Sequence, residues 1–257
     1  MKKNLFFLSS FLIVLASCKK HNDGDRDNFF KGPEQKFQGG KTWTWLQTDK
    51  DGKPEKIAIA IDEAALTSLD PGTDESHEAT DELSLKFHSK AAITPFSHAL
   101  LEWNPHGHEP AGVYDKPHFD FHFYIQPEAE RLAIPAYAVD SSKFLIFPAP
   151  GYMPDLYVSG PGGVPQMGTH WIDVTTPELN GHPFTQTFLY GSYDGKVTFY
   201  EPMITKAFLD ANPLFERSFP LPAKFTMGGY YPTTLQVKKE NGVLNIILQG
   251  FVYKQAS

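Results

Sequence analysis

The stretch PHFDFHFY, residues 117 to 124, places two histidines and an aspartate at alternate positions. Alternate residues of a β-strand share one face, so His118, Asp120 and His122 would lie on one side and the intervening phenylalanines on the other. Imidazole and carboxylate groups bind metals and move protons. The stretch therefore predicts a strand with one packing face and one face able to do chemistry.

The spacing restricts what this face can bind. In a straight strand the Cα atoms of His118 and His122 lie about 13 Å apart, and neighbouring members of the trio lie about 6.6 Å apart. Ligand atoms must come within about 2.0 to 2.2 Å of one ion. Two alternatives follow: a bulge near Asp120 brings both histidines to one metal, or the aspartate replaces one of them.

Two further polar residues interrupt apolar runs elsewhere in the chain. His170 stands in MGTHWID and Glu201 stands in VTFYEPMIT. We expect a divalent metal to be held by His118, His122, His170 and Glu201, with Asp120 as a catalytic acid–base group, an orienting partner or an alternative ligand. Zinc is the first choice for such a set, and iron and manganese also accept imidazole and carboxylate ligands.

The loop PHGHEP adds His106, His108 and Glu109, which together with Tyr124 are candidates for the rim of a small-molecule site. In an enzyme, the metal would activate water or polarise a carbonyl group. The alternative is a non-catalytic module for ligand binding or assembly, in which the same histidines form a hydrogen-bonded polar network. An open coordination position would favour catalysis, so the sequence leaves enzyme status undecided.

The N-terminus carries an export signal. Residues 1 to 17 run from two lysines through an apolar stretch too short to span a bilayer, and they end in small residues before Cys18, the only cysteine in the chain. The segment around Cys18 resembles the lipobox of bacterial lipoproteins, which implies acylation of the thiol and attachment to a membrane. Lys19 gives no aspartate-type cue for inner-membrane retention, so we expect the outer membrane. Any metal must be bound without thiolates.

The charge of the chain argues against a nucleic-acid partner. The formal net charge is −7, and removal of Lys2 and Lys3 with the signal takes it to −7 − 2 = −9. Such a chain lacks the basic surface that nucleic acid requires. A small-molecule ligand and an oligomer both stay open.

Short runs of alternating apolar and polar residues, together with residue pairs that favour tight turns, predict a mainly β fold. We expect either an antiparallel barrel or a sandwich, with a few short helices. Residues 18 to 40 are polar, and we expect them to form a lipid-anchored flexible tether. Residues 41 to 257 are expected to form one β-rich domain. Asn241-Gly242 and Asp194-Gly195 predict hairpin turns, and residues 127–133 and 202–211 predict helices. The expected strands are 41–48, 55–62, 82–88, 97–103, 118–125, 143–147, 169–174, 186–193 and 196–202.

Three blocks, WNPHGHEPAGVYDKPHFDFHFY, MGTHWID and GKVTFYEPMIT, resemble a family of bacterial secreted or lipid-anchored proteins with a domain of unknown function, first described structurally in a thermophile. The resemblance spans about residues 80 to 210. It implies that the histidines of HFDFH, His170 and Glu201 belong to one site. The cluster is also similar to the metal sites of cupins, although it lacks their histidine and glutamate spacing.

Overall fold

The structure, a computed structural model, describes residues 28–72 and 81–257. The expected signal peptide, Cys18 and the first part of the expected tether lie outside these residues. Within the described part of the chain, no helix is both long enough and apolar enough to cross a membrane.

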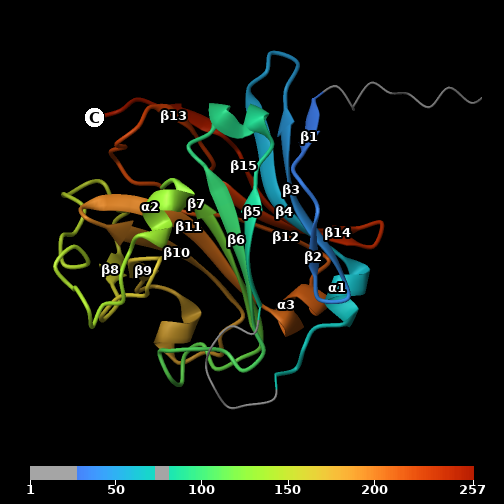
Figure 1. The fold of residues 1–257 in the computed structure, drawn as a ribbon, viewed down its shortest axis with the longest axis horizontal. Coiled ribbons are helices and arrows are strands. Elements are labelled where there is room, and N and C mark those ends of the chain that lie inside the picture. The colour runs from blue at the N-terminus through green and yellow to red at the C-terminus, as the bar shows by residue number, and fades with distance from the viewer. Residues whose placement is uncertain (1–27, 73–80) are drawn as a thin grey trace, which may run out of the picture.

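The first of two large antiparallel sheets combines the N-terminal and C-terminal strands, which are blue and red in Figure 1. Its strand order is β1-β3-β4-β15-β14-β12, and β2 also pairs with β3. The strands are β1 (Phe29–Lys31), β2 (Gln35–Phe37), β3 (Gly40–Thr48), β4 (Pro54–Asp62), β12 (Leu214–Ser218), β14 (Thr234–Glu240) and β15 (Val243–Gln249).

The second sheet comes from the middle of the chain and carries the candidate site. Its order is β5-β6-β7-β11-β10-β9-β8, again antiparallel throughout. The strands are β5 (Asp81–Lys86), β6 (His98–Asn104), β7 (His118–Tyr124), β8 (Tyr157–Ser159), β9 (Thr169–Asp173), β10 (Gln186–Tyr193) and β11 (Lys196–Thr205). A separate two-stranded sheet joins β13 (Gly229–Tyr231) and β16 (Val252–Lys254).

The two large sheets pack against each other through one apolar cluster. Ile59 and Ile246 of the first sheet and Phe121 and Tyr200 of the second belong to it, and all four are almost fully buried. Each fully buried side chain of this kind contributes about 1.5 to 3 kcal/mol through the hydrophobic effect. The mainly β fold is thus confirmed, and because the sheets do not close, the architecture is a sandwich rather than a barrel.

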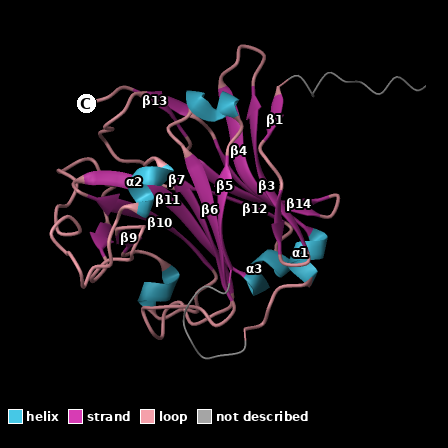
Figure 2. Cartoon of the chain, viewed as in Figure 1, coloured by secondary structure: helices cyan, strands magenta, loops and turns pink. Residues whose placement is uncertain are grey.

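Short helices connect the strands, as Figure 2 shows. They are α1 (Glu63–Thr67), α2 (Glu128–Leu132) and α3 (Lys206–Ala211), with 3-10 turns at Ser89–Ile93 and Pro177–Asn180. The helix expected at 127–133 is confirmed as α2. The helix expected at 202–211 begins only at Lys206, because residues 202–205 continue β11 and Thr205 caps the helix through its hydroxyl.

Both predicted hairpin turns are present. Asn241 and Gly242 have φ values of 51° and 74°, and Asp194 and Gly195 have 51° and 76°. Two consecutive positive φ angles match the twist of antiparallel strands, which explains the Asn-Gly and Asp-Gly pairs. These turns connect β14 to β15 and β10 to β11.

The expected tether is shorter than the sequence indicates. Instead of reaching residue 40, it gives way to β1 and β2, which pair with β3. Phe37 is 2% exposed in the core cluster, and Phe30 packs against that cluster. Lysines, glutamate and glycines around these two phenylalanines give the segment its polar composition, although its apolar side chains are enough to dock it on the sheet.

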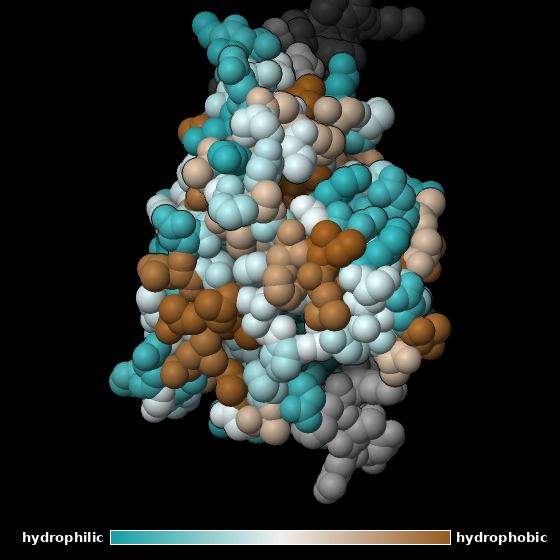
Figure 3. All heavy atoms as spheres, turned by 90° about the vertical axis from the view of Figure 1, so that its left-hand side faces the viewer, coloured by the Kyte–Doolittle hydropathy of each residue, from teal (hydrophilic) through white to brown (hydrophobic). Residues whose placement is uncertain are grey.

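The strand expected at 143–147 is also wrong. Residues 142–145 form turns, with only Phe144 buried, so the apolar run covers the sheet instead of joining it. The following segment, residues 149–168, forms loops on either side of β8. Figure 3 faces the side where this loop region lies and shows brown hydrophobic patches among hydrophilic ones. Exposed apolar residues of the region include Val139, Leu145, Ile146, Phe147 and Leu156.

Candidate metal centre

The polar face of β7 lies on the outer side of the second sheet, away from the sandwich core. Phe119, Phe121 and Phe123 point into the core cluster, as the alternation predicts. His118 and His122 are nevertheless 0% and 1% exposed, because connecting loops cover this outer face. A buried polar face needs partners of its own, since stranded polar groups cost a few kcal/mol each.

Two small apolar clusters lie on this outer face. One contains Tyr124, Met167 and Phe199, and the other contains Tyr114, Phe184, Leu189 and Met203. Met167, Tyr114 and Phe184 come from the covering loops. The polar side chains of β7 are therefore enclosed by apolar contacts, which strengthens electrostatic interactions among them.

β7 is straight along its length. It pairs with β6 without interruption from His98 opposite Tyr124 to Asn104 opposite His118. With β11, Tyr200 lies opposite Phe123 and Met203 opposite Asp120, so the register is the same on both sides of Pro202, which has no N–H to donate. This register places Glu201 opposite His122.

The expected four-ligand set is therefore divided. Of its members, His122, His170 and Glu201 come together, and each offers a ligand atom within 4.8 Å of the other two. His118 instead joins His108 and Asp120 in a second group, because a straight strand keeps the two β7 histidines too far apart for one ion. We call these the His122 group and the His118 group.

Three strands build the His122 group. Glu201 Oε1 lies 3.4 Å from His122 Nε2, and Glu201 Oε2 lies 3.5 Å from His170 Nε2. His170 comes from β9, which reaches the group across β10, where Gly191 is paired with both His170 and Phe199. A Cβ atom at Gly191 would lie 2.1 Å from the Phe199 ring, so glycine is required where this ring packs between the two histidines.

The contacts in the His122 group are close but are not hydrogen bonds. Both ring nitrogens of His122 and Oε2 of Glu201 are buried without a hydrogen-bond partner among the described residues. Donor atoms about 2.0 to 2.1 Å from a tetrahedral ion would lie about 3.3 to 3.4 Å from one another. The separations of Glu201 from His122 and from His170, 3.4 and 3.5 Å, are close to the spacing between two ligand atoms on one metal.

Burial sets the charge states in this group. Desolvation lowers the pKa of His122 to about 3 and that of His170 to about 4. It also holds the pKa of Glu201 well above its usual range, with further help from Asp120 and Glu102. Both imidazoles are therefore neutral at pH 7, the form that can bind a metal.

Glu102 of β6 is a site residue that sequence reasoning missed. Its Oε2 lies 3.2 Å from His122 Nδ1, on the side of the ring away from Glu201. Burial, with the neighbouring Asp120 charge, raises its pKa well above the usual range. The available signal was the glutamate in HALLEWN, which interrupts an apolar strand just as Glu201 does.

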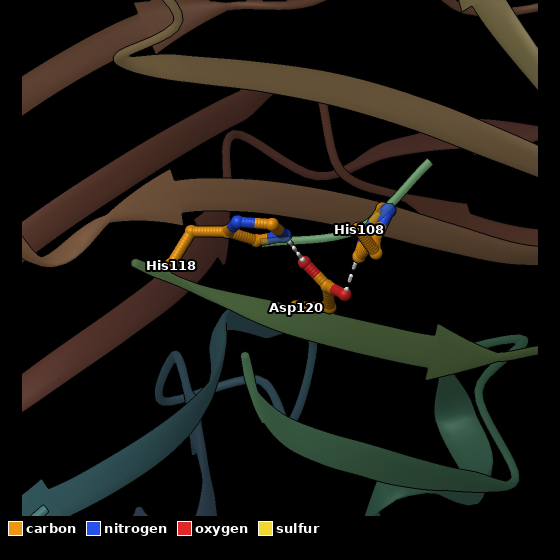
Figure 4. Close-up of side chains that lie close together, drawn as sticks. All are labelled: His108, His118 and Asp120. Carbon is orange, nitrogen blue, oxygen red and sulfur yellow. Dashed lines mark hydrogen bonds and ion pairs between the residues drawn. The ribbon is translucent and has the colours of Figure 1, made fainter. Parts of the chain in front are cut away.

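Figure 4 shows the His118 group, in which Asp120 lies between the two histidines. Asp120 Oδ1 is 3.1 Å from His118 Nε2, and Oδ2 is 3.2 Å from His108 Nε2. Asn104, also missed from sequence, donates to Asp120 Oδ2 at 2.8 Å. Burial alone would raise the pKa of Asp120, but the two imidazoles hold it well below its usual range.

The remaining expected rim residues lie in different places. His106 is exposed beside Gly72 and belongs to neither group, and Glu109 is exposed and accepts a hydrogen bond from the Ala111 amide. Tyr124 is buried and stacked on His98 and His122, with a phenolic oxygen that has no hydrogen-bond partner in the described structure. Of these three, only Tyr124 lies at the site.

A hollow of about 590 Å³ lies beside the β10–β11 turn. Its lining includes Gln126, Glu130, Lys143, Tyr193 and Thr198, and it shares no residue with the two histidine groups. Neither group therefore opens into this hollow. The sides of the groups nearest solvent are at His170, with 20% of its side chain exposed, and at His108, with 27%.

Fold and site together define an antiparallel β-sandwich with two buried histidine–carboxylate groups, each able to hold a metal ion. Comparison of the chain with protein-family models, with curated proteins and with solved structures found no match.

Proposed function

We propose that this protein binds a divalent metal at the His122 group and acts through it at the cell envelope. The observation that carries the proposal is the convergence of two neutral imidazoles on one carboxylate, at 3.4 and 3.5 Å, without hydrogen-bond geometry. A plain polar network would need hydrogen bonds at this depth of burial. A metal ion would bind His122, His170 and Glu201 at once and so give all three buried groups a partner.

Zinc is the metal we propose first. Two imidazole nitrogens and one carboxylate form the donor set of several catalytic zinc sites, in which a fourth position is left for water or substrate. Iron and manganese accept the same ligands, and the absence of thiolate argues against metals that favour sulfur. Glu102 Oε2 lies 3.2 Å from His122 Nδ1 outside hydrogen-bond geometry, and it would become the acceptor that orients this ring once a metal holds Nε2.

Three protein ligands rather than four favour a metal that acts on a small molecule. Such a metal activates water or polarises a carbonyl or similar group. On the same outer face, the Tyr124 hydroxyl would position a substrate, and Asp120 and His108 would move protons as long as no ion is held between them. In the alternative, a binding or assembly module, a substrate or partner would occupy the fourth position without chemical change.

We test the metal site with variants of the mature chain. Purified protein is equilibrated with Zn²⁺ and desalted, and bound zinc is measured per chain. Glu201→Gln and His170→Ala should each lose one zinc relative to wild type, whereas the exposed His182→Gln should lose none. If both site variants keep the full zinc content of wild type, the proposed site is wrong. Circular dichroism checks that the variants are folded.

We also propose that Cys18 is acylated and that the protein is anchored in the outer membrane. The export signal and the lone cysteine support this, and the sandwich would then lie outside the cytoplasm. When the full chain is expressed in a bacterium, Cys18→Ser should move the protein from the detergent phase to the aqueous phase of a detergent partition. Retention of the serine variant in the detergent phase would contradict acylation at this residue.

A further inference from the structure

We infer that the His118 group is a second metal position, so that the outer face of the second sheet holds a pair of metal ions. This position uses His108, His118 and Asp120, which share no ligand with the His122 group. It does not require the first position to be filled. Three observations on these residues support it.

The first observation is the orientation of His118. Its Nδ1 lies 2.7 Å from the backbone carbonyl of Lys116, and because a carbonyl oxygen can only accept, Nδ1 carries the hydrogen. In the neutral ring Nε2 then presents a lone pair. The ring is fully buried, so this lone pair must be satisfied from within the protein.

The second observation is what faces that lone pair. Asp120 Oδ1 is 3.1 Å away, yet neither this oxygen nor His118 Nε2 has a hydrogen-bond partner in the described structure. A proton on Nε2 would miss the oxygen, because the contact lacks hydrogen-bond geometry. A cation placed between the two atoms would relieve the repulsion and satisfy both, as it does for ligands about 3.0 to 3.4 Å apart on one ion.

His108 supplies the third ligand. Its Nδ1 is 2.6 Å from the Glu109 carbonyl, which leaves Nε2 directed at Asp120. Because Nδ1 donates to that carbonyl, Nε2 donates to Asp120 Oδ2 at 3.2 Å only when the ring carries both protons. Metal binding would displace the Nε2 proton and replace this hydrogen bond, and Asn104 would still donate to Oδ2. Both histidines thus have the backbone carbonyl partners that fix the orientation of ligating imidazoles.

The third observation is the balance of charge. Glu102, Asp120 and Glu201 are all buried on this face, at 7%, 4% and 1% exposure. Buried carboxylates cost several kcal/mol each unless they are paired. When all three are ionised, one divalent ion leaves this layer with a charge of 2 − 3 = −1, so a single ion does not neutralise the carboxylates, and a second ion brings the sum to 4 − 3 = +1. Asp120 and His122 are two residues apart on one strand, so the ions would be neighbours roughly 6 to 7 Å apart.

The test is the zinc content of single and double variants of the mature chain, measured after equilibration with excess Zn²⁺ and desalting. We expect two zinc ions in wild type, one in Asp120→Asn, one in His118→Gln, one in Glu201→Gln and none in Asp120→Asn/Glu201→Gln. His106→Gln is the matched control, because His106 belongs to the same loop as His108 but to neither group, and it should keep two.

The outcomes separate this inference from the proposed function. One zinc in wild type that persists in both Asp120→Asn and His118→Gln but disappears in Glu201→Gln overturns the second position and leaves the first. One zinc that disappears in Asp120→Asn and persists in Glu201→Gln overturns the first position instead. If either His118-group variant does not fold, as judged by circular dichroism, the other variant and the wild-type stoichiometry still decide the result.

Discussion

At the scale of single residues, the outer face of the second sheet places imidazole nitrogens next to carboxylate oxygens without hydrogen bonds between them. His122 Nε2 faces Glu201, and His118 Nε2 faces Asp120. In a protein interior such pairs are costly, because neither partner regains what it lost by leaving water. Metal ions are the simplest partners that both members of each pair accept.

Glu102 offers a test of this reading that does not remove a ligand. A carboxylate beside the second nitrogen of a ligating histidine orients the ring and strengthens its bond to the metal. Glu102→Gln should therefore weaken zinc binding at the His122 group about 10-fold to 100-fold, measured by competition with a chromophoric chelator.

Glu82→Gln is the matched control for this variant. Glu82 lies opposite Glu102 on β5 but is exposed, so its loss should leave zinc affinity unchanged. Equal affinity in Glu102→Gln and Glu82→Gln would show that Glu102 does not support the metal.

At the scale of elements, one face of β7 packs in the sandwich core and the other carries the histidines and Asp120 of the site. The alternation that places histidines on the outer face places Phe121 at 0% exposure in the core, where it packs with both sheets. The stability of the sandwich and the chemistry of the site therefore depend on neighbouring residues of one strand.

Phe121→Ala should lower the free energy of unfolding by about 3 to 5 kcal/mol, the usual cost of truncating a buried phenylalanine. Urea denaturation of the metal-free protein measures this change. Phe29→Ala is the control, because Phe29 is 43% exposed and should cost much less. A loss below about 1 kcal/mol for Phe121→Ala would contradict the central place of this face in the core.

Most strands could be predicted from alternation and turn residues, because those signals are local. The segment 29–37 and the run 143–147 could not be predicted. In the first, a polar composition hides Phe37, which is in the core, and Phe30, which packs against it; in the second, the apolar residues cover the sheet instead of joining it. Short edge pieces such as β8 depend on a neighbouring strand for their pairing, which sequence alone does not reveal.

The site was predictable in part for the same reason. His122, His170 and Glu201 each interrupt an apolar strand, and the structure brings them together. The separation of His118 from them follows from the register of β7 against β6 and β11, which is a tertiary property. Spacing along the strand predicted two alternatives, and the straight strand selects the one in which Asp120 pairs with His118.

At the scale of the whole molecule, the two groups lie on the outer face of the second sheet of the sandwich, and the connecting loops pack over them. Glu102 lies on β6, and β7 carries His118, Asp120 and His122. His170 lies on β9 and Glu201 on β11. Among the members of the two groups, only His108 comes from a loop. Sites on rigid strands hold their geometry more precisely than sites on loops. Most of the candidate ligands therefore lie on the sheet, and the loops cover them.

The position of bound metal tests the central claim most directly. Crystals of the zinc-loaded protein, measured at the zinc absorption edge, should give an anomalous peak about 2.0 to 2.2 Å from His122 Nε2, His170 Nε2 and an oxygen of Glu201. Zinc-loaded crystals with no peak within bonding distance of these three residues would contradict the claim.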